Sequence, residues 1–216
     1  MKDNGAMTSE GAGQRLNRLL ERAGIAALDE RMIGNFEKYV SLILRWNARF
    51  NLTSLRTESA ILSKHLVESI ACAMALPQGI VSLLDYGSGA GLPGIPIALC
   101  RPEIAVTLAE SQGKKAAFLQ ETIRVLGIAA RVHAGRAEKL GTLFDCVMLR
   151  AVDRMPRAVA AAVQLIVPDG WLVLMITGAE VAQLRAAAGA GIAWEEPARL
   201  PFGDDRILAM GRRVNS

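Results

Sequence analysis

A glycine-rich segment that follows an apolar run carries the residue types best suited to hold a ligand against the backbone. The run Leu83-Leu84 ends in Asp85 and leads into Gly87-Ser88-Gly89-Ala90-Gly91, which Leu92-Pro93-Gly94 follows. Glycine adopts positive φ freely and, having no Cβ, lets a ligand lie directly against the main chain. Pro93 suits the first turn of a helix, where its missing N–H is not needed. The segment predicts a strand, a ligand-binding loop and a helix, in that order.

The same segment contains Gly89-x-Gly91-x-x-Gly94, which matches the dinucleotide-binding fingerprint literally. Two features weigh against NAD. Asp85 would bring a negative charge close to a pyrophosphate, and the glycine loop is longer than the tight turn of that fingerprint. A sulfonium ligand carries a positive charge and no phosphate, so a nearby carboxylate favours it. We therefore predict that the loop binds S-adenosylmethionine through Asp85, Gly87, Gly89, Gly91 and Leu92.

Acidic residues at two later positions extend this prediction. Glu110 ends the next apolar run, roughly twenty residues past the loop, where adenosine-binding folds place an acid for the ribose hydroxyls. A carboxylate there can accept hydrogen bonds from both hydroxyls. In the third turn, a backbone N–H of Ala137 or Glu138 is a candidate donor to the adenine edge. Taken singly, each acid is better explained as a solvated strand or helix end, so the prediction depends on their register with the glycine loop.

The apolar run from Phe144 to Arg150 should end over the same crevice and limits the chemistry. An Asn/Asp-Pro-Pro-aromatic signature, typical of exocyclic amine methylation, is absent, because the sequence is Leu149-Arg150-Ala151-Val152. A Pro-Cys pair for attack on pyrimidine C5 is absent too, and no histidine lies nearby in the chain. What remains is transfer to a nucleophile that needs no deprotonation, such as guanine N7, with catalysis by positioning. We predict that Arg150 is buried and orients the methionine end of the cofactor or an RNA phosphate.

The elements that must position these residues follow from the apolar periodicity. Short apolar runs alternate with helical stretches from residue 80 onward, which predicts an α/β, Rossmann-like fold with a mostly parallel sheet covered by helices on both faces. The expected strands are Ile80–Asp85, Ala105–Glu110, Arg131–Ala134, Phe144–Arg150, Gly170–Ile176 and Arg206–Gly211. The expected helices are Pro93–Cys100, Lys114–Leu126, Arg154–Val167 and Ala179–Ala190. In such sheets the ligand crevice lies at the carboxyl ends of the strands.

Three regions are expected along the chain. Residues 1–13 are small and polar and predict a disordered leader. Residues 14–79 show helical spacing and predict an N-terminal helical section that packs on the core, since its helices are too few to enclose a core of their own. Residues 80–216 form the predicted Rossmann-like methyltransferase core.

Composition excludes some classes of protein. The chain has 216 residues, 51% hydrophobic and 21% charged, and a formal net charge of +4, which permits a nucleic-acid partner without requiring one. Cys72, Cys100 and Cys146 are far apart and predict reduced core thiols, and two histidines are too few for a histidine-rich metal site. No signal or membrane-spanning pattern is seen, so we expect a cytoplasmic protein without a metal or a membrane partner.

Taken together, the motifs resemble the bacterial ribosomal RNA small subunit methyltransferase G family, also called GidB, from about Leu16 to about Arg212. The upstream markers are Trp46-Asn47, Asn51-Leu52-Thr53, Lys64-His65 and Glu68-Ser69. The others are the loop Asp85 to Pro96, then Glu110-Ser111, Lys114-Lys115, Phe118-Leu119, Arg136-Ala137-Glu138, Phe144-Asp145 and Leu149-Arg150-Ala151. The family usually has Asp-Ser where this chain has Glu68-Ser69, and a small aliphatic residue where it has Tyr86.

This resemblance implies a class I S-adenosylmethionine-dependent methyltransferase fold and transfer of a methyl group to N7 of a guanine near the decoding centre of 16S rRNA. The product would be S-adenosylhomocysteine, and the partner 16S rRNA or the small ribosomal subunit. The resemblance places cofactor contacts at Gly87, Leu92, Ala137, Glu138 and Arg150, with Glu110 on the ribose. We expect a monomer.

Other charged residues have weaker assignments. We expect His65 to be a structural histidine bonded to Glu68, one helical turn away. Lys114, Lys115 and Arg136 are candidate RNA contacts, and Arg45, Arg49, Arg56 and Arg124 would extend a phosphate-binding track. Each alone is better explained as a solvated helix charge, and only their position around one crevice mouth would change that interpretation.

Two other functions stay open at this point. The first is a methyltransferase of another RNA, a small molecule or a protein; a small-molecule or protein substrate predicts an additional lid or specificity insertion that this compact chain lacks. The second is a non-catalytic or NAD-binding module. Titration with S-adenosylmethionine and with NAD separates the second from the main hypothesis.

Overall fold

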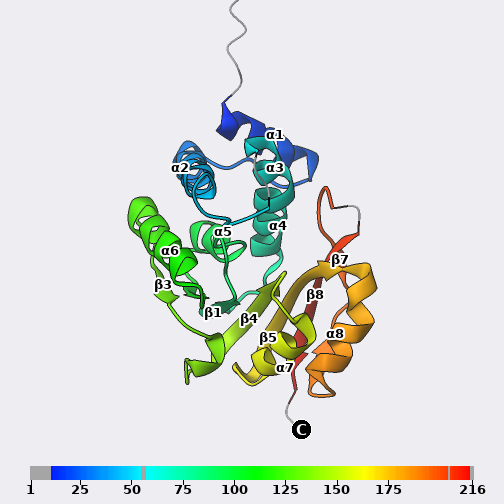
Figure 1. Cartoon of the computed structure of the whole chain (residues 1–216). Coiled ribbons are helices and arrows are strands. Elements are labelled where there is room, and N and C mark those ends of the chain that lie inside the picture. The colour runs from blue at the N-terminus through cyan, green and yellow to red at the C-terminus, as the bar shows by residue number, and fades with distance from the viewer. Residues whose placement is uncertain (1–10, 55–56, 204, 215–216) are drawn as a thin grey trace, which may run out of the picture.

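The computed structural model describes residues 11–54, 57–203 and 205–214. Within them, eight strands form one sheet in the order β3-β2-β1-β4-β5-β8-β6, with β7 paired to β8 beside this path (Figure 1). Strands β1 (Ser82–Tyr86), β2 (Ala105–Ala109), β3 (Ala130–His133), β4 (Phe144–Arg150) and β5 (Ile166–Thr177) pair in parallel. Strand β8 (Arg206–Arg213) is antiparallel to β5, and β6 (Ile192–Trp194) and β7 (Ala198–Arg199) are antiparallel to β8. The predicted α/β class and mostly parallel sheet are confirmed.

The two faces of the sheet are covered by different helices because neighbouring strand residues point to opposite sides. Leu83 and Met148 belong to one apolar cluster, which includes residues of α4 (Val67–Ala75), α5 (Gly94–Cys100) and α6 (Gly113–Leu126). Leu84 and Leu149 belong to the other, with α7 (Met155–Val163) and α8 (Val181–Ala188). All four leucine and methionine side chains are fully buried.

The N-terminal section consists of α1 (Ala12–Arg22), α2 (Glu30–Asn47), α3 (Glu58–Ile61), a π-helical turn η1 (Leu62–Leu66) and α4. Its buried apolar residues belong to the same cluster as α5, α6 and one face of the sheet. In Figure 1, α4 lies beside α5 and α1 lies at the top, away from the sheet. These helices therefore have no separate core. Burial of this shared surface, at roughly 25 cal/mol per Å², holds them on the sheet.

Some predicted boundaries were wrong. The leader was expected to extend through residue 13, and its first ten residues lie outside the described part, but α1 begins at Ala12. Gly13 belongs to this helix because its N–H donates to Glu37 across a close contact of α1 with α2. The helix expected to reach Val167 ends at Val163, since Ile166 already pairs with Phe144 in β4.

The remaining differences are small. Pro93 caps α5 from the position before it and does not begin the helix. The helix expected at 179–190 begins as a short 3-10 turn, η3 (Gly178–Glu180), and α8 ends at Ala188. Strands β6 and β7 were not predicted, because so short a run has no periodicity and gains its form from pairing with β8.

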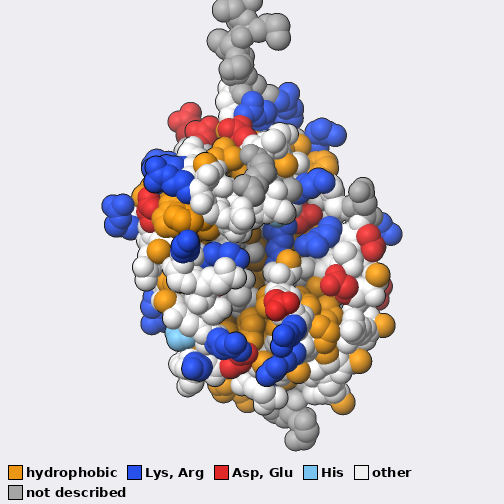
Figure 2. All heavy atoms as spheres, in the orientation of Figure 1, with side chains coloured by type: hydrophobic (Ala, Val, Ile, Leu, Met, Phe, Trp, Pro, Cys, Tyr) orange, Lys and Arg blue, Asp and Glu red, His pale blue; other side chains and the backbone are white. Residues whose placement is uncertain are grey.

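None of the helices in the described residues is both long enough and apolar enough to span a membrane. Lys and Arg side chains lie on both sides of a hollow that runs down the face shown in Figure 2.

Candidate active site

The glycine loop after β1 is held in place by its own N–H groups. The N–H groups of Gly87 and Ser88 both donate to the carbonyl of Ala109 at 3.0 Å, at the end of β2. The N–H of Gly91 donates to the carbonyl of Ser88 at 2.7 Å. Gly87, Gly89 and Gly91 have φ of +73°, +56° and +82°, which side chains with a Cβ rarely adopt. The three φ values confirm the prediction that the backbone at these positions requires glycine.

Asp85 lies beneath the loop, and the role expected for it needs revision. Its carboxylate is 1% exposed and accepts from the N–H of Gly94 at 3.1 Å, while Ser88 Oγ donates to its carbonyl. Burial raises the pKa of Asp85 to about 7. Asp85 lines neither of the two cavities described below. It ties β1 to the first residue of α5 and so braces the loop from inside.

Gly91 also faces the interior. A Cβ there would lie 2.6 Å from Ile95 Cγ1 and 3.0 Å from Leu119 Cδ2. Beside it, Tyr39 Oη on α2 donates to the carbonyl of Ala90 at 2.6 Å, in a fully buried contact. The loop is thus anchored by the N-terminal section as well as by the sheet.

Glu110 connects the loop to the second parallel strand. Its Oε2 accepts from the N–H of Gly89 at 2.9 Å and its Oε1 from the N–H of Gln112 at 2.7 Å. The side chain is 6% exposed and lines the second cavity. Each carboxylate oxygen has a second lone pair that can accept from a hydroxyl. Glu110 therefore shapes the loop and keeps an acceptor edge toward the cavity.

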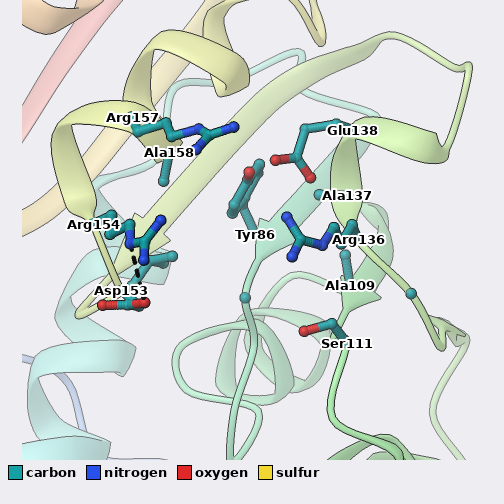
Figure 3. Close-up of a pocket in the computed structure, with 13 residues that line it drawn as sticks. Tyr86, Ala109, Ser111, Arg136, Ala137, Glu138, Asp153, Arg154, Arg157 and Ala158 are labelled. Carbon is teal, nitrogen blue, oxygen red and sulfur yellow. Dashed lines mark ion pairs between the residues drawn. The ribbon is translucent and has the colours of Figure 1, made fainter.

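The first cavity, of about 330 Å³, lies at the carboxyl ends of β1, β2 and β3. Gly87, Ala137, Glu138 and Arg136, all predicted from the sequence, line it. Figure 3 shows Tyr86 facing Glu138, with Arg136, Arg154 and Arg157 around the same space. The hydrogen bond from the Tyr86 hydroxyl lowers the pKa of Glu138. The cavity thus combines two carboxylates, Glu138 and Asp153, with an aromatic ring and three guanidinium groups.

The second cavity, of about 380 Å³, continues from the first and shares Gly87, Ser111, Val152 and Asp153 with it. Its lining includes the predicted residues Gly87, Gly89, Leu92, Glu110, Lys115 and Arg150. Lys114 does not line it, because its Nζ lies 4.8 Å from the centre of the Phe50 ring. The two neighbouring lysines therefore have different surroundings.

Arg150 ends β4 and is 7% exposed in its side chain, as predicted. Its Nη2 donates to Glu68 Oε2 at 2.8 Å, to His65 Nδ1 at 2.8 Å and to the carbonyl of Lys64 at 3.0 Å. Its Nη1 lies 3.3 Å from Ser69 Oγ. The residues of the family-like Lys64-His65 and Glu68-Ser69 pairs thus converge on one guanidinium.

The expectation that His65 bonds Glu68 was wrong. Its ring nitrogens contact Arg150, the carbonyl of Lys64 at 3.2 Å and Thr53 Oγ1 at 3.0 Å. No histidine was expected nearby to act as a general base; His65 does line the second cavity, but both of its ring nitrogens are engaged. Burial, followed by the charge of Arg150, lowers the pKa of His65 to about 4.

Several lining residues were not predicted from the sequence to belong to the site. They are Thr53, Tyr86, Ser111, Asp153, Arg154 and Arg157. Arg154 has φ of +50° and lies in the turn after β4 with Asp153, 4.0 Å from its carboxylate. The position directly after a parallel strand is a usable signal for such residues. Within the described ranges no cluster of three or more His, Cys, Asp or Glu side chains is arranged to hold a metal ion.

Comparison with known proteins places this geometry in a family. The family model described as rRNA small subunit methyltransferase G (GidB) matches residues 32–192. The chain is 40% identical over 152 residues to the "Ribosomal RNA small subunit methyltransferase G" of Xanthomonas oryzae pv. oryzae, covering 69% of this chain and 71% of that protein. The protein of the same name from Roseiflexus sp. is 36% identical over 207 residues, covering 89% of this chain and 88% of that one.

Solved structures bear on the fold alone. A methyltransferase from Pyrococcus furiosus superposes with a TM-score of 0.60 at 14% identity, covering 84% of this chain and 100% of that chain. A SAM-dependent methyltransferase from Aquifex aeolicus superposes with a TM-score of 0.57 at 15% identity, covering 72% and 93%. The fold is that of class I S-adenosylmethionine-dependent methyltransferases. By the extent of the model match and the identity to these relatives, the chain belongs to the rRNA small subunit methyltransferase G family.

Proposed function

We propose that this protein transfers a methyl group from S-adenosylmethionine to N7 of a guanine in 16S rRNA near the decoding centre. The observation that carries the proposal is the continuous crevice from Glu138 past the glycine loop to Arg150, at the carboxyl ends of the parallel strands. Family membership supports both the methyl transfer and the ribosomal RNA substrate. The position of the guanine rests on the resemblance of the motifs.

The crevice fits a cofactor without phosphate. In the loop, the N–H groups of Gly87, Ser88, Gly89 and Gly91 already donate within the protein, so they are not free to cradle a diphosphate. A diphosphate would also meet the carboxylate of Glu110 beside Gly89. These contacts favour S-adenosylmethionine over a dinucleotide.

The residues that would hold the cofactor divide between the two cavities. In the first, the backbone at Ala137 and Glu138 would face the adenine. Glu110, which lines the second cavity, would accept from the ribose hydroxyls. In the second, Gly87, Gly89 and Leu92 leave room for the methionine part, and Arg150 lies at its far end. An added Cβ at Gly89 would meet nothing closer than the Gly87 carbonyl oxygen at 3.9 Å, so this surface is free for a ligand. When bound, the cofactor supplies an electrophilic methyl group on a sulfonium.

The acceptor that suits this site is one that attacks through a lone pair. His65 lines the second cavity, but one ring nitrogen accepts from Arg150 and the other lies against Thr53. With both nitrogens engaged, this imidazole is not placed to remove a proton. Guanine N7 needs no such removal, and the residues act by positioning and by excluding water.

The rim of the crevice supplies cations for RNA phosphates. Lys115 lines the second cavity, and Arg136, Arg154 and Arg157 line the first. Lys114, also on α6, lies over the Phe50 ring and lines neither cavity. Of the expected track, Arg45 instead forms an ion pair with Glu121, and Arg56 lies outside the described residues. Counterion release by these contacts predicts binding that weakens as salt rises.

The proposal is tested with small subunits from cells that lack the protein. Labelled S-adenosylmethionine and the purified protein should transfer label to 16S rRNA, and nuclease mapping should place it on 7-methylguanine. Extracted cellular metabolites serve as the comparison substrate. Label in metabolites alone, or tight binding of NAD without binding of S-adenosylhomocysteine, would contradict the proposal.

A further inference from the structure

A third cavity adjoins the site and lies outside the part of the crevice assigned to the cofactor. It measures about 410 Å³ and is lined by Lys64, Glu68, Phe202 and Arg206 among others. It shares His65, Arg150 and Ala151 with the second cavity and no residue with the first. The three cavities therefore follow one another in a row, and Arg150 stands at the boundary between the second and the third.

Glu68 is a buried carboxylate directed at this third cavity. Glu68 is 3% exposed and lines the cavity. Its Oε2 accepts from Arg150 Nη2 at 2.8 Å, with Arg206 Nε at 3.9 Å. Among the described residues, no hydrogen-bond donor is found for Oε1, which lies close to Gly203 on the cavity wall. Because Glu68 lines the cavity, this oxygen can accept a hydrogen bond from a ligand that enters it.

The ion pair with Arg150 at 2.8 Å favours the carboxylate form of Glu68. Burial raises the pKa of Glu68, and the charges of Arg150, Arg206 and Lys64 offset only part of that rise. A carboxylate in the charged form accepts hydrogen bonds and donates none. Any ligand edge that meets Oε1 must therefore offer N–H or O–H groups.

Arg150 retains donors as well. A guanidinium has five N–H groups. Its bonds to Glu68, His65, Lys64 and Ser69 use Nη2 and one hydrogen of Nη1. The crevice thus offers, in order from the second cavity into the third, donors on Arg150 and then an acceptor on Glu68.

We propose that the third cavity receives the Watson–Crick edge of the acceptor guanine, with Arg150 donating to O6 and Glu68 accepting from N1–H and the 2-amino group. This inference rests on the proposed function and adds the group that selects the base. Guanine presents N7, then O6, then N1–H and the 2-amino group around its ring. When N7 lies in the second cavity, this order matches the order of Arg150 and Glu68.

Adenine is rejected by the same two residues. Beside N7 it carries a 6-amino donor and then the N1 acceptor, so a donor would face Arg150 and an acceptor would face Glu68. A site built to hydrogen-bond one pattern rejects the opposite one strongly, because its own buried groups are left unpaired. Glu68 is thereby a specificity-determining residue, and the buried pair with Arg150 fixes its orientation.

Binding of mononucleotides to the protein loaded with S-adenosylhomocysteine tests this directly. GMP, IMP and AMP are titrated against the loaded protein, with ligand-observed NMR as the readout. IMP keeps O6 and N1–H but lacks the 2-amino group. The wild type should bind GMP a few-fold more tightly than IMP and at least tenfold more tightly than AMP. Glu68→Gln should reduce the GMP preference over AMP at least fivefold while its affinity for S-adenosylhomocysteine stays within twofold.

A matched control is Glu58→Gln, since Glu58 on α3 pairs with Arg15 and lines none of the three cavities. Its GMP preference should equal that of the wild type. Glu68→Asp keeps the charge and shortens the reach, so it should also lose the preference, and it serves if Glu68→Gln does not fold. Equal or undetectable binding of GMP and AMP by the loaded wild type overturns the inference without any variant. An unchanged preference in a folded Glu68 variant does the same.

The two proposals fail separately. If the wild type neither binds S-adenosylhomocysteine nor methylates small subunits, the proposed function is lost. If it does both but treats GMP and AMP alike, only the base-selection role of Glu68 is lost.

Discussion

Nη2 of Arg150 lies 2.8 Å from Nδ1 of His65, although 85 positions separate the two residues in the chain. Nδ1 also lies 3.2 Å from the carbonyl of Lys64, but the guanidinium contact is the shorter one. A guanidinium only donates hydrogen bonds, so Nδ1 accepts from it and the imidazole is neutral. The ring proton is then on Nε2, which faces Thr53 Oγ1 at 3.0 Å. This contact joins the end of β4 to the N-terminal section and fixes the wall of the second cavity.

The neutral state of His65 predicts a pH dependence of stability. Its pKa falls from 6.5 to about 4 on folding, so below pH 6.5 the unfolded chain binds a proton that the native protein does not. Above pH 6.5 the neutral His65 does not lower the free energy of unfolding. As the pH falls from 6.5 to about 4, the free energy of unfolding should decrease by at most about 3 kcal/mol because of this residue. Urea unfolding at pH 7.5 and at pH 4.5 measures it.

The comparison needs His65→Asn as its reference. Asp85, whose pKa is raised to about 7, changes stability in the opposite sense over the same range, because its charged form is disfavoured in the fold. Subtracting the variant from the wild type cancels Asp85. The difference in free energy of unfolding between the wild type and His65→Asn should shrink toward acid pH. A difference that stays constant would show that His65 is not held neutral.

Tyr39→Phe should loosen the glycine loop. The change removes the buried donor to the Ala90 carbonyl and should lower the free energy of unfolding by about 1–3 kcal/mol. Affinity for S-adenosylhomocysteine, measured by calorimetry, should fall several-fold because the loop is less ordered. Thr122→Val is the control, since it removes a buried donor to the Phe118 carbonyl within α6. Equal affinity losses in both variants would argue against a specific link to the loop.

Gly89→Ala should separate loop strain from loss of ligand space. Gly89 and Gly79 both have positive φ, and an added Cβ at either meets no other described atom closer than 3.9 Å. Each alanine variant should lose about 1–2 kcal/mol of stability through backbone strain. Only Gly89 lines the second cavity, so only Gly89→Ala should weaken S-adenosylhomocysteine binding, by at least tenfold. Normal affinity in Gly89→Ala would remove this part of the proposed cofactor site.

Lys115→Gln should weaken RNA binding and lower its salt dependence. Removing a single ion pair with an RNA phosphate reduces the slope of log K against log salt by about 1. Lys38→Gln on α2 is the control, because Lys38 is exposed and lines none of the three cavities. Binding to small subunits is measured at several salt concentrations. A slope equal in all three proteins would exclude Lys115 from phosphate binding.

The sequence determined the parts of this protein that depend on local pattern. Alternating apolar runs gave β4 its bounds, and the spacing of glycines in the 87–94 segment identified the loop, whose φ values are indeed positive. Local periodicity and glycine content suffice here because they reflect which face is buried and which backbone conformations are possible. The motifs that resembled the family belonged to the same class of signal, and the family assignment is confirmed.

Only the tertiary structure decided where individual side chains point. Asp85 and Glu110 are both acids at strand ends, yet one braces the loop from below and the other lines the cavity. Lys114 and Lys115 are neighbours, and one lies over Phe50 while the other faces the crevice. His65 pairs with Arg150 rather than with Glu68 on its own helix. Such choices depend on contacts between segments far apart in the chain, and local periodicity carries no information about them.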